Sequence, residues 1–344
     1  MLVCVTGGTG FVGSFVVRAL LADGHSVRVL HRQSSKKDAV EGLDYESFIG
    51  DVTDYDSLKL AFEGCDWVFH VAAVADYWRA DKDWMHEVNV EGTRKVLEAS
   101  KIAQVKRVIF TSSAAAIGLS DNPDMPSDES ADFNLAPEHF YYGYTKVLAE
   151  NIVQEFVADG LDVVIVNPVV VIGAGDLNMI SGTYITQVAQ WQWLVPRTSG
   201  GIAVSDVRDI AQGHLAAAKK GRTGERYILN SENLSNDEWF GLIADCLGVA
   251  SPVFPTPNIL IPFVAKIIDM LRAIGIKTAI NADQVRLGAK FVYFDASKAH
   301  QELYQPQINM RDSVQETIAW YREAGYIKET SWGKFLTVIG NVWK

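Results

Sequence analysis

The sequence predicts an α/β fold in which a doubly wound parallel sheet is followed by a smaller, mainly helical C-terminal lobe. Two observations predict it. Short apolar runs alternate with amphipathic stretches through the first half of the 344-residue chain, and a glycine-rich loop follows the first apolar run. Because consecutive parallel strands need crossover connections, this alternation indicates a parallel sheet covered by helices on both faces.

The predicted strands are short apolar runs at residues 2–6, 26–31, 44–49, 66–71, 106–111 and 162–167. The predicted helices between them have apolar residues at helical spacing and cover residues 11–23, 54–63, 83–102 and 139–158. The pattern loosens after Pro168, where we expect strands at 202–205 and 227–230 and helices at 207–220 and 236–247. The expected domains are residues 1–168, with 201–230 returning to the sheet, and a lobe of residues 169–200 and 231–344.

Composition excludes several classes of protein. The formal net charge of −11 leaves no basic face for duplex nucleic acid, so no nucleic-acid partner is expected. The three cysteines are scattered without a C-x-x-C pair, which favours a reducing compartment and a cytoplasmic protein; we expect no signal peptide. The seven histidines form no ligand cluster, so no metal is expected either.

Residues 257–276 form an apolar stretch in the second half of the chain. Lys266, Asp269 and Arg272 interrupt it, and its uninterrupted part is far shorter than the roughly 20 residues that a membrane span needs. We therefore expect an amphipathic helix packed in the lobe. Contact with a lipid surface, or a place in the wall of an apolar substrate pocket, are the alternatives.

A glycine loop, Thr6-Gly7-Gly8-Thr9-Gly10-Phe11-Val12-Gly13, joins the first predicted strand to the first predicted helix. Glycine lets the backbone turn at positive φ and lets a pyrophosphate approach without a Cβ in the way. The start of the helix offers free N–H groups and the positive end of its dipole to that phosphate. Together they predict a Rossmann-type dinucleotide site formed by Thr6, Gly7, Gly10, Phe11, Val12 and Gly13.

The residues that end the second strand discriminate between the two nicotinamide dinucleotides. A carboxylate there binds the ribose 2′-hydroxyl of NAD, whereas an arginine can bind the 2′-phosphate of NADP. The run here is Val27-Arg28-Val29-Leu30-His31-Arg32, and the first carboxylate after it is Asp38. We therefore expect NADP(H) to be favoured over NAD(H), with Arg32 at the 2′-phosphate.

Tyr142 and Lys146 form a Y-x-x-x-K pair. Residues four apart lie on one face of a helix, where an ammonium can lower the pKa of a phenol and make it a proton donor and acceptor near neutral pH. The fifth strand ends in Phe110-Thr111-Ser112-Ser113, where a hydroxyl can bind a substrate oxygen as its charge changes.

The glycine loop, the strand-end serine and the Y-x-x-x-K helix, in this order, resemble the extended short-chain dehydrogenase/reductase family over nearly the whole chain. The resemblance implies a Ser/Tyr/Lys triad. Ser113 matches the catalytic serine by its position in T-S-S-A, with Ser112 as the alternative. Tyr142 would be the general acid/base, and Lys146 would support it and bind the nicotinamide ribose.

Further roles follow from the same resemblance. Asn89, in the N-V-x-G-T motif, would support a water network at the active site, or would only cap a helix. The implied cofactor contacts are Asp51 and Val52 at the adenine, Ala72 and Ala73 along the cofactor, and the segment from Pro168 to Val171 beside the nicotinamide. The two alanines have ordinary packing as their alternative.

Family membership alone does not fix a substrate, because the family includes ketone reductases, hydroxysteroid dehydrogenases, sugar-nucleotide epimerases and dehydratases. Ser113 is followed by three alanines rather than by the Asp-Glu pair of dehydratases. The strand-end V-R-x-x-x-R pattern and the C-terminal half resemble the dihydroflavonol 4-reductase-like and 3β-hydroxysteroid dehydrogenase-like branch. Tyr184, Trp191 and Trp193, with the 257–276 helix, would form an apolar pocket, or would only pack in the core.

We therefore expect an NADP(H)-dependent oxidoreductase that interconverts a ketone and a secondary alcohol on a medium-sized, largely apolar cyclic substrate. One alternative is a nucleotide-sugar epimerase, in which Arg197 or Arg208 would hold the diphosphate. Another is a non-catalytic NADP-binding scaffold or sensor. The resemblance also implies a homodimer through the helices at 83–102 and 139–158, as in many members of the family.

Overall fold

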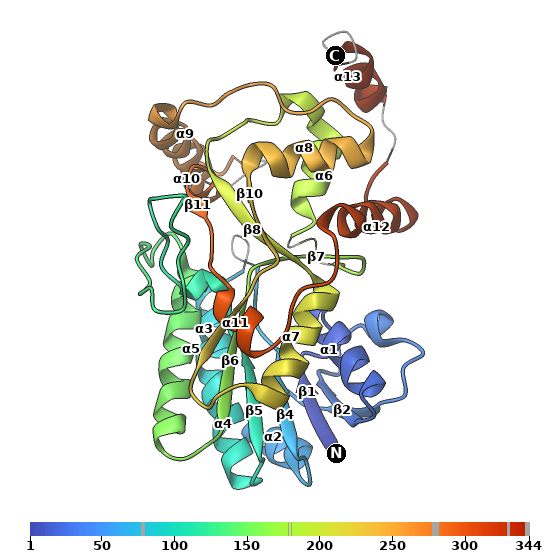
Figure 1. The fold of residues 1–344 in the computed structure, drawn as a ribbon, viewed down its shortest axis with the longest axis vertical. Helices are drawn as coiled ribbons and strands as arrows, with labels where there is room; N and C mark the ends of the chain where they lie inside the picture. The colour runs from blue at the N-terminus through green and yellow to red at the C-terminus, as the bar shows by residue number, and fades with distance from the viewer. Residues whose placement is uncertain (77–79, 178, 180, 277–281, 329–330, 341–344) are drawn as a thin grey trace.

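The computed structural model describes residues 1–344 except 77–79, 178, 180, 277–281, 329–330 and 341–344. A seven-stranded parallel sheet forms the centre of the first domain, in the order β3-β2-β1-β4-β5-β6-β9 (Figure 1). Its strands are β1 (Leu2–Thr6), β2 (Ser26–His31), β3 (Glu46–Ile49), β4 (Trp67–His70), β5 (Arg107–Thr111), β6 (Val163–Pro168) and β9 (Arg226–Leu229). The strand order reverses between β1 and β4, and ligands of open parallel sheets bind at the carboxyl ends of the strands beside such a reversal.

Helices cover both faces of this sheet. One face carries α1 (Phe11–Ala22), α7 (Val207–Lys220) and α11 (Ser297–Glu302), and the other carries α2 (Tyr55–Phe62), α4 (Gly92–Ile102) and α5 (Tyr141–Ala158). Successive side chains of a strand point to opposite faces. Accordingly Val3 and Val5 of β1 lie in the core under α1 and α7, whereas Cys4 lies in the core under α2 and α4. The predicted doubly wound α/β fold is confirmed.

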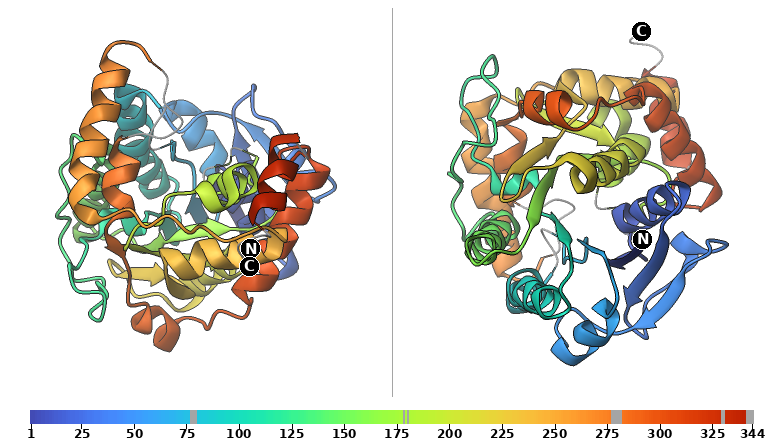
Figure 2. Two further views of the ribbon diagram at one scale, coloured as in Figure 1. Left: turned by 90° about the horizontal axis from the view of Figure 1, so that it is seen from above. Right: turned by 60° about the horizontal axis from the view of Figure 1, so that its bottom comes forward.

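The C-terminal lobe lies at the far end of the molecule from the N-terminus (Figure 1). It contains a second, small sheet of β7 (Val170–Ile172), β8 (Gly201–Asp206), β10 (Glu232–Ser235) and β11 (Phe291–Val292), in which β8 pairs with all three others. Its helices are α6 (Thr183–Trp191), α8 (Asn236–Leu247), α9 (Ile261–Ala273), α10 (Ala282–Gly288), α12 (Met310–Glu323) and α13 (Ser331–Gly340). Seen from above, α9 lies on one side of the lobe and α12 and α13 lie on the other (Figure 2).

Residues 201–230 do not return to the main sheet as one unit. β9 joins that sheet beside β6, and α7 covers it, but β8 pairs antiparallel with β10 in the small sheet. The connection from β9 to β10 is two residues long, and the chain passes there from the main sheet into the small one. The expected division into 1–168 with a return segment and a separate lobe remains a prediction.

The predicted helix at 83–102 is divided into three parts. They are α3 (Lys82–His86), a π-helical turn η2 (Glu87–Glu91) and α4, with no residue outside helical structure between them. Short 3₁₀ turns occur at η1 (Asp38–Val40), η3 (Ala114–Ala116), η4 (Gln192–Leu194) and η5 (Asn258–Leu260). A π turn widens the helix by one residue and is frequent at functional sites, and this one carries Asn89.

Within the described part of the chain, no helix has both the length and the apolar character needed to cross a membrane. The three cysteines are free. The described residues also contain no group of three or more His, Cys, Asp or Glu side chains arranged to hold a metal ion.

Candidate active site

The glycine loop makes a tight turn between β1 and α1. Gly7 has φ +71°, and a Cβ at this position would lie 2.6 Å from the backbone nitrogen of Ala72. A Cβ on Gly13 would lie 2.1 Å from the carbonyl oxygen of Gly7, so the first turn of α1 can pack on the loop only with glycine there. Gly10, in contrast, is exposed, and a Cβ there would meet only the Gly7 oxygen, at 3.2 Å.

The beginning of α1 fits a pyrophosphate. Gly10 is its N-cap and offers no side-chain cap, and the first turn contains no acidic residue. The amides of Phe11, Val12 and Gly13 are therefore free to bind an anion at the positive end of the helix dipole. The described residues thus provide the donors and the open approach at Gly10 that a dinucleotide phosphate needs.

The end of β2 places Arg32 at the surface. His31 is buried, with Nδ1 2.9 Å from the Arg32 carbonyl oxygen and Nε2 2.7 Å from Ser47 Oγ. The Arg32 side chain is exposed and makes no ion pair with another described residue. The carboxylate of Glu46, on the neighbouring β3, pairs with Arg28 at 3.0 Å and not with Arg32.

The other expected cofactor contacts lie around the same edge of the sheet. Ala72 and Ala73 are half-buried in the segment that follows β4. Asp51 accepts hydrogen bonds from both the backbone and the hydroxyl of Thr53, and the Val52 side chain is buried against Gly92. Pro168 ends β6, and Val171 belongs to the same core as the start of α1. Their roles at the cofactor remain predictions.

The predicted triad is brought together at the carboxyl end of β5. Tyr142 is the second residue of α5, Lys146 lies one turn further, and Ser113 follows β5 as the N-cap of η3. All three are buried, and a hydrogen bond from Ser113 to the Tyr142 hydroxyl joins the serine and the tyrosine. Two hydroxyl groups on different elements thus meet at one point, where a substrate oxygen can bind both.

The electrostatics of the pair differ from the expectation that Lys146 lowers the pKa of Tyr142. Burial raises the pKa of Tyr142 to about 12, although the Ser113 hydrogen bond lowers it. The Lys146 ammonium donates to the Thr111 carbonyl oxygen at 2.9 Å and lies 6.0 Å from the centre of the Tyr142 ring. Burial lowers the pKa of Lys146 to about 8, and the charge of Glu150 opposes that change.

A buried polar cluster under α5 separates the roles of the two candidate serines. Ser112 donates to the carboxylate of Glu150, which also accepts from Asn167 Nδ2 at 2.7 Å and pairs with Arg226 Nη1 at 3.1 Å. Ser112 is therefore committed to this cluster. Ser113 faces Tyr142 instead, which favours Ser113 as the serine of the site.

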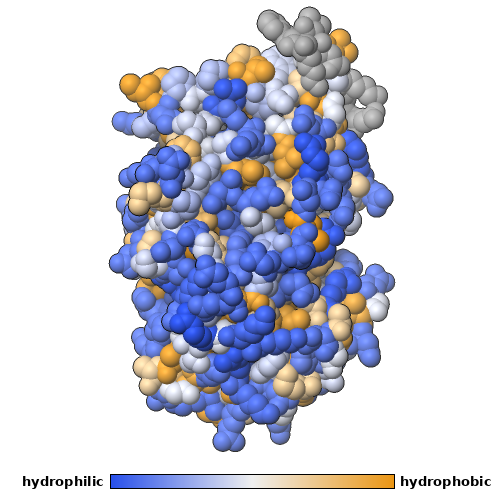
Figure 3. All heavy atoms as spheres, in the orientation of Figure 1, coloured by the Kyte–Doolittle hydropathy of each residue, from blue (hydrophilic) through white to orange (hydrophobic). Residues whose placement is uncertain are grey.

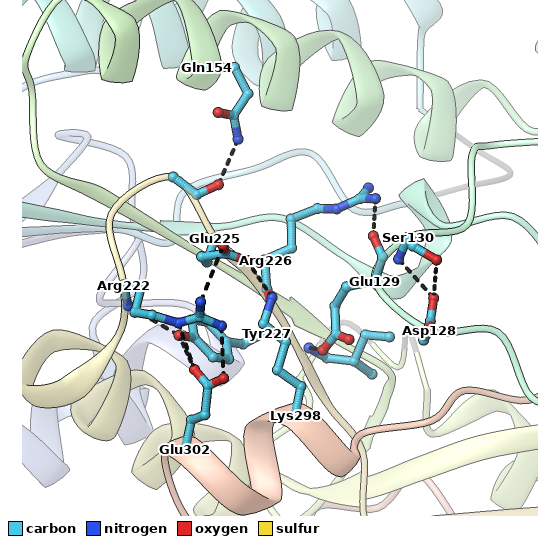
Figure 4. Close-up of polar contacts among 12 residues, drawn as sticks. Asp128, Glu129, Ser130, Gln154, Arg222, Glu225, Arg226, Tyr227, Lys298 and Glu302 are labelled. Atoms are coloured by element: carbon cyan, nitrogen blue, oxygen red, sulfur yellow. Dashed lines mark hydrogen bonds and ion pairs between the residues drawn. The ribbon is translucent and has the colours of Figure 1, made fainter.

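Arg226 ties this cluster to the edge of the sheet. Its guanidinium, from β9, also donates to the carbonyl oxygen of Glu129, and Figure 4 shows it extending toward that segment and away from the Arg222–Glu302 pair. The Glu129 carboxylate accepts from the Ile228 amide at 2.9 Å, and burial raises its pKa. The cluster therefore joins α5 to β5, β6, β9 and the loop before α5.

His70 links the glycine loop to the helix that carries Asn89. The Thr6 oxygen accepts from the Ala72 amide at 3.3 Å, and the Thr6 hydroxyl lies 2.8 Å from His70 Nδ1. On the other side Thr93 donates to the Asn89 carbonyl oxygen, so its own oxygen accepts from His70 Nε2 at 3.1 Å. The Asn89 carbonyl therefore makes Nε2 the nitrogen that carries the proton. Because burial lowers the pKa of His70 to about 3, the ring is neutral and Nδ1 accepts from the Thr6 hydroxyl.

Asn89 joins two elements of the site. Its side chain pairs with the backbone of Val74, accepting from the amide at 2.8 Å and donating to the carbonyl at 3.0 Å, and it donates to Thr145 Oγ at 3.2 Å. These contacts hold the segment after β4 against α5. Its proposed part in a water network stays a prediction.

His214 of α7 holds the end of β5. Its Nδ1 donates to the Ile210 carbonyl oxygen at 2.7 Å, so Nε2 accepts from the Thr111 hydroxyl at 3.0 Å. The Thr111 carbonyl in turn receives Lys146. The sequence motifs did not reveal His70, His214, Asn167 or Arg226, because each acts through contacts between distant segments; Glu150 could have been found, since it continues the i+4 spacing of Tyr142 and Lys146.

The aromatic residues expected at a substrate pocket lie in different places. Tyr184 packs in the lobe core, where the centre of its ring lies 6.4 Å from the ring centre of Trp239 and 6.3 Å from that of Phe240. Trp193 packs on Phe254, and its indole donates to the Leu336 carbonyl of α13 at 3.1 Å. Trp191 is exposed. Core and surface packing account for these contacts, and a pocket built from all three remains a prediction.

Comparison with known proteins agrees with this fold and site. The profile of the NAD dependent epimerase/dehydratase family matches residues 3–230. The chain is 35% identical to a putative dihydroflavonol 4-reductase of Synechocystis, over 94% of this chain and 95% of that protein. It is 32% identical to sterol demethylase protein B of Methylococcus capsulatus, over 95% of this chain and 100% of that protein. The crystal structure of gox2253 matches with a TM-score of 0.83 at 33% identity, covering 95% of this chain and 99% of that one.

A parallel sheet with a dinucleotide-type glycine loop, in a chain whose relatives are reductases, defines an NAD(P)-dependent oxidoreductase. The chain belongs to the NAD dependent epimerase/dehydratase family. The predicted resemblance to extended short-chain dehydrogenases/reductases is confirmed.

We predict opposite outcomes for the two neighbouring serines. Ser113→Ala removes a hydroxyl that faces the reacting oxygen, so kcat should fall by about 10²-fold. Ser112→Ala removes a donor to Glu150, so it should lower the free energy of unfolding by about 1–2 kcal/mol and leave kcat close to that of the parent chain. Steady-state kinetics and urea unfolding of both variants measure this. A folded Ser112→Ala variant without turnover would reverse the assignment.

The two buried histidines predict a loss of stability in mild acid. Burial lowers the pKa of His70 to about 3, with Lys146 adding to the effect, and burial lowers the pKa of His214 to about 4. Their pKa in the unfolded chain is near 6.5, so the unfolded state binds more protons below that pH and the folded state is disfavoured. The free energy of unfolding should fall by about 1.4 kcal/mol per pH unit for each histidine, from about pH 6.5 down to about pH 4.

Urea unfolding at a series of pH values between these limits measures the slope. His214→Gln removes one of the two groups, so its slope should be shallower by the contribution of one proton. An unchanged slope in this variant would contradict the assignment of His214 as a buried neutral group.

Proposed function

We propose that this protein is an NADP(H)-dependent oxidoreductase that interconverts a ketone and a secondary alcohol on a medium-sized, largely apolar cyclic molecule. The observation that carries the proposal is the hydrogen bond between Ser113 and the buried Tyr142 hydroxyl, with Lys146 one helical turn away. The relatives named for dihydroflavonol reduction and for sterol demethylation support a bulky cyclic substrate.

In the direction of reduction, Tyr142 donates its proton to the carbonyl oxygen while Ser113 hydrogen-bonds the same oxygen. A phenol keeps its proton at neutral pH, and burial, which raises the pKa of Tyr142 to about 12, favours this protonated form further. A dinucleotide bound at the glycine loop would supply the hydride for the carbonyl carbon. Lys146 would hold the nicotinamide ribose from its place beside the Thr111 carbonyl.

Two arginines that an epimerase would use for a substrate diphosphate already have carboxylate partners. Arg197 Nε lies 3.0 Å from Asp237. Arg208 lies 2.9 Å from the buried Asp206 and 3.0 Å from Glu316. Binding a diphosphate would break these pairs, which disfavours the nucleotide-sugar epimerase that the family name also covers. The non-catalytic scaffold is not retained, since the relatives are reductases.

Two further expectations accompany the proposal, a cytoplasmic location and a homodimer. The free cysteines support a reducing, cytoplasmic location. A homodimer through the helices at 83–102 and 139–158 is supported by the side-by-side packing of α4 and α5, which the Arg94–Glu155 pair at 3.3 Å joins.

Tyr142→Phe tests the chemistry. The variant keeps the ring in its buried position but has no proton to donate, so turnover should fall by about 10²–10⁴-fold while NADPH affinity is unchanged. The measurements are NADPH oxidation with a panel of bulky cyclic ketones and a fluorescence titration with NADPH. Tyr144→Phe is the matched control, because Tyr144 packs near Phe133 outside the triad and should keep full activity. A near-normal rate in Tyr142→Phe would refute the proposal.

Arg32→Ala tests the cofactor preference. A charge-assisted hydrogen bond to a phosphate contributes about 1.5–3 kcal/mol, so NADPH affinity should fall by about 10- to 100-fold while NADH affinity stays the same. Titrations of both dinucleotides with the parent chain and the variant measure this, and NADH serves as the internal control. Equal affinities of the parent chain for the two dinucleotides would remove the preference for NADP(H).

A further inference from the structure

Two opposite charges lie inside the molecule, one helical turn apart on α5. Charged side chains normally stay at the surface, and the face of the molecule drawn in Figure 3 is mainly hydrophilic. Lys146 and Glu150, in contrast, are only 2% and 6% exposed. A buried charge without partners is costly, so each of these two groups needs contacts that keep it ionised.

Glu150 has contacts that favour a carboxylate. One of its oxygens accepts from Ser112 and from Asn167 Nδ2 at 2.7 Å, and the other pairs with Arg226 Nη1 at 3.1 Å. Three donors, one of them a guanidinium, stabilise the ionised form of the group. Glu150 therefore keeps a negative charge in the interior.

The contacts of Lys146 are of another kind. Its ammonium donates to the Thr111 carbonyl oxygen at 2.9 Å and lies 5.2 Å from the centre of the Phe110 ring. Neither group carries a charge. Burial lowers the pKa of Lys146 to about 8, and the charge of Glu150 opposes this change. Without that charge, the lysine would lose its proton at a lower pH, close to neutrality.

Other titratable groups that surround Lys146 are neutral near pH 7. Burial lowers the pKa of His70, at the end of β4, to about 3, and burial raises the pKa of Tyr142 to about 12. His214 of α7 binds the hydroxyl of Thr111, and burial lowers its pKa to about 4. None of the three therefore changes its charge between about pH 6 and pH 8, and none balances the charge of the ammonium.

We propose that Glu150 is a positioning residue of the site, whose charge keeps the Lys146 ammonium protonated at the place where the nicotinamide ribose would bind. A neutral amine would bind the ribose hydroxyls more weakly than an ammonium does. The effect on catalysis rests on the function proposed above, whereas the effect on the charge of Lys146 does not. A purely structural role, in which Glu150 only ties α5 to the sheet, predicts effects that do not depend on pH.

Glu150→Gln tests the proposal through a pH profile. The variant keeps the shape of the side chain and removes its charge, so Lys146 should lose its proton at a pH lower by about one unit or more. The value of kcat/KM for NADPH reports the free protein. With a panel of bulky cyclic ketones, it should be about fivefold below that of the parent chain at pH 8 and nearly equal to it at pH 6.

Urea unfolding gives a second measurement that needs neither cofactor nor turnover. Between the lowered pKa of Lys146 in Glu150→Gln and about pH 8, the folded variant has released a proton that the unfolded chain retains. The unfolded state binds more protons there, so the stability of the variant should rise with pH relative to the parent chain. The ratio of their unfolding equilibrium constants should shrink by up to about tenfold per pH unit in this range.

Two further variants separate charge from structure. Ser112→Ala removes a hydrogen bond to Glu150 but leaves its charge, so the ratio of its kcat/KM to that of the parent chain should be the same at pH 6 and at pH 8. Arg226→Gln removes the cation that pairs with Glu150, so Lys146 should keep its proton to a higher pH. Because Arg226 is half-buried, this variant still tests the proposal if Glu150→Gln does not fold. Circular dichroism checks the fold of each variant.

Three outcomes would overturn the proposal. The first is a defect in Glu150→Gln of the same size at pH 6 and at pH 8, both in kcat/KM and in unfolding. The second is a Ser112→Ala variant whose pH profile shifts as that of Glu150→Gln does. The third is a shift of the Arg226→Gln profile to lower pH. If the parent chain reduces no ketone of the panel, the proposed function fails, and the unfolding measurements alone decide the charge of Lys146.

Discussion

The buried ammonium of Lys146 is the constraint on which the rest of the site depends. Its residue is only 2% exposed, and a buried charge is tolerated only with direct hydrogen-bond and charge partners. The Thr111 carbonyl receives the ammonium, and the Glu150 carboxylate lies one helical turn further along α5. Glu150 in turn needs donors, which Ser112, Asn167 and Arg226 provide. A single lysine thus determines polar residues on three strands and one helix.

The same requirement explains why neutral histidines flank the site. His70 lies between the hydroxyls of two threonines, and His214 lies between a threonine hydroxyl and a backbone carbonyl. The carbonyls of Asn89 and Ile210 fix which nitrogen of each ring carries the proton. A second positive charge near Lys146 would be costly, and Lys146 itself helps to lower the pKa of His70. Directed hydrogen bonds that add no charge therefore join the ends of β1 and β4 to each other and to α4, and the end of β5 to α7.

The sequence predicts those parts of this arrangement that are local. The strands, the glycine loop and the Tyr142–Lys146 spacing each lie within a few residues, where periodicity and backbone geometry decide the structure. The choice between Ser112 and Ser113 is not local, because it depends on Glu150, 38 positions after Ser112, and on Arg226 from β9. The pKa of Tyr142 was misjudged for a related reason: helical spacing indicates that Lys146 is near, but burial, which raises the pKa, depends on the whole fold. β8 lies in a different sheet from the one expected, because the local sequence indicates where a strand lies but not which strand it pairs with.

The molecule places charge and apolar surface in an unusual way, and this bears on the kind of ligand it handles. Lysine, glutamate and arginine side chains are buried or half-buried behind the triad, while phenylalanine, isoleucine and methionine side chains are exposed on α9. Buried charges fix the geometry of donors before a substrate arrives, which matters most when the substrate itself offers few polar groups. A bulky apolar ketone offers only one oxygen to Ser113 and Tyr142, so its remaining binding energy must come from apolar contact. The exposed apolar residues of α9, one helix away from α5, agree with the apolar ligand proposed above.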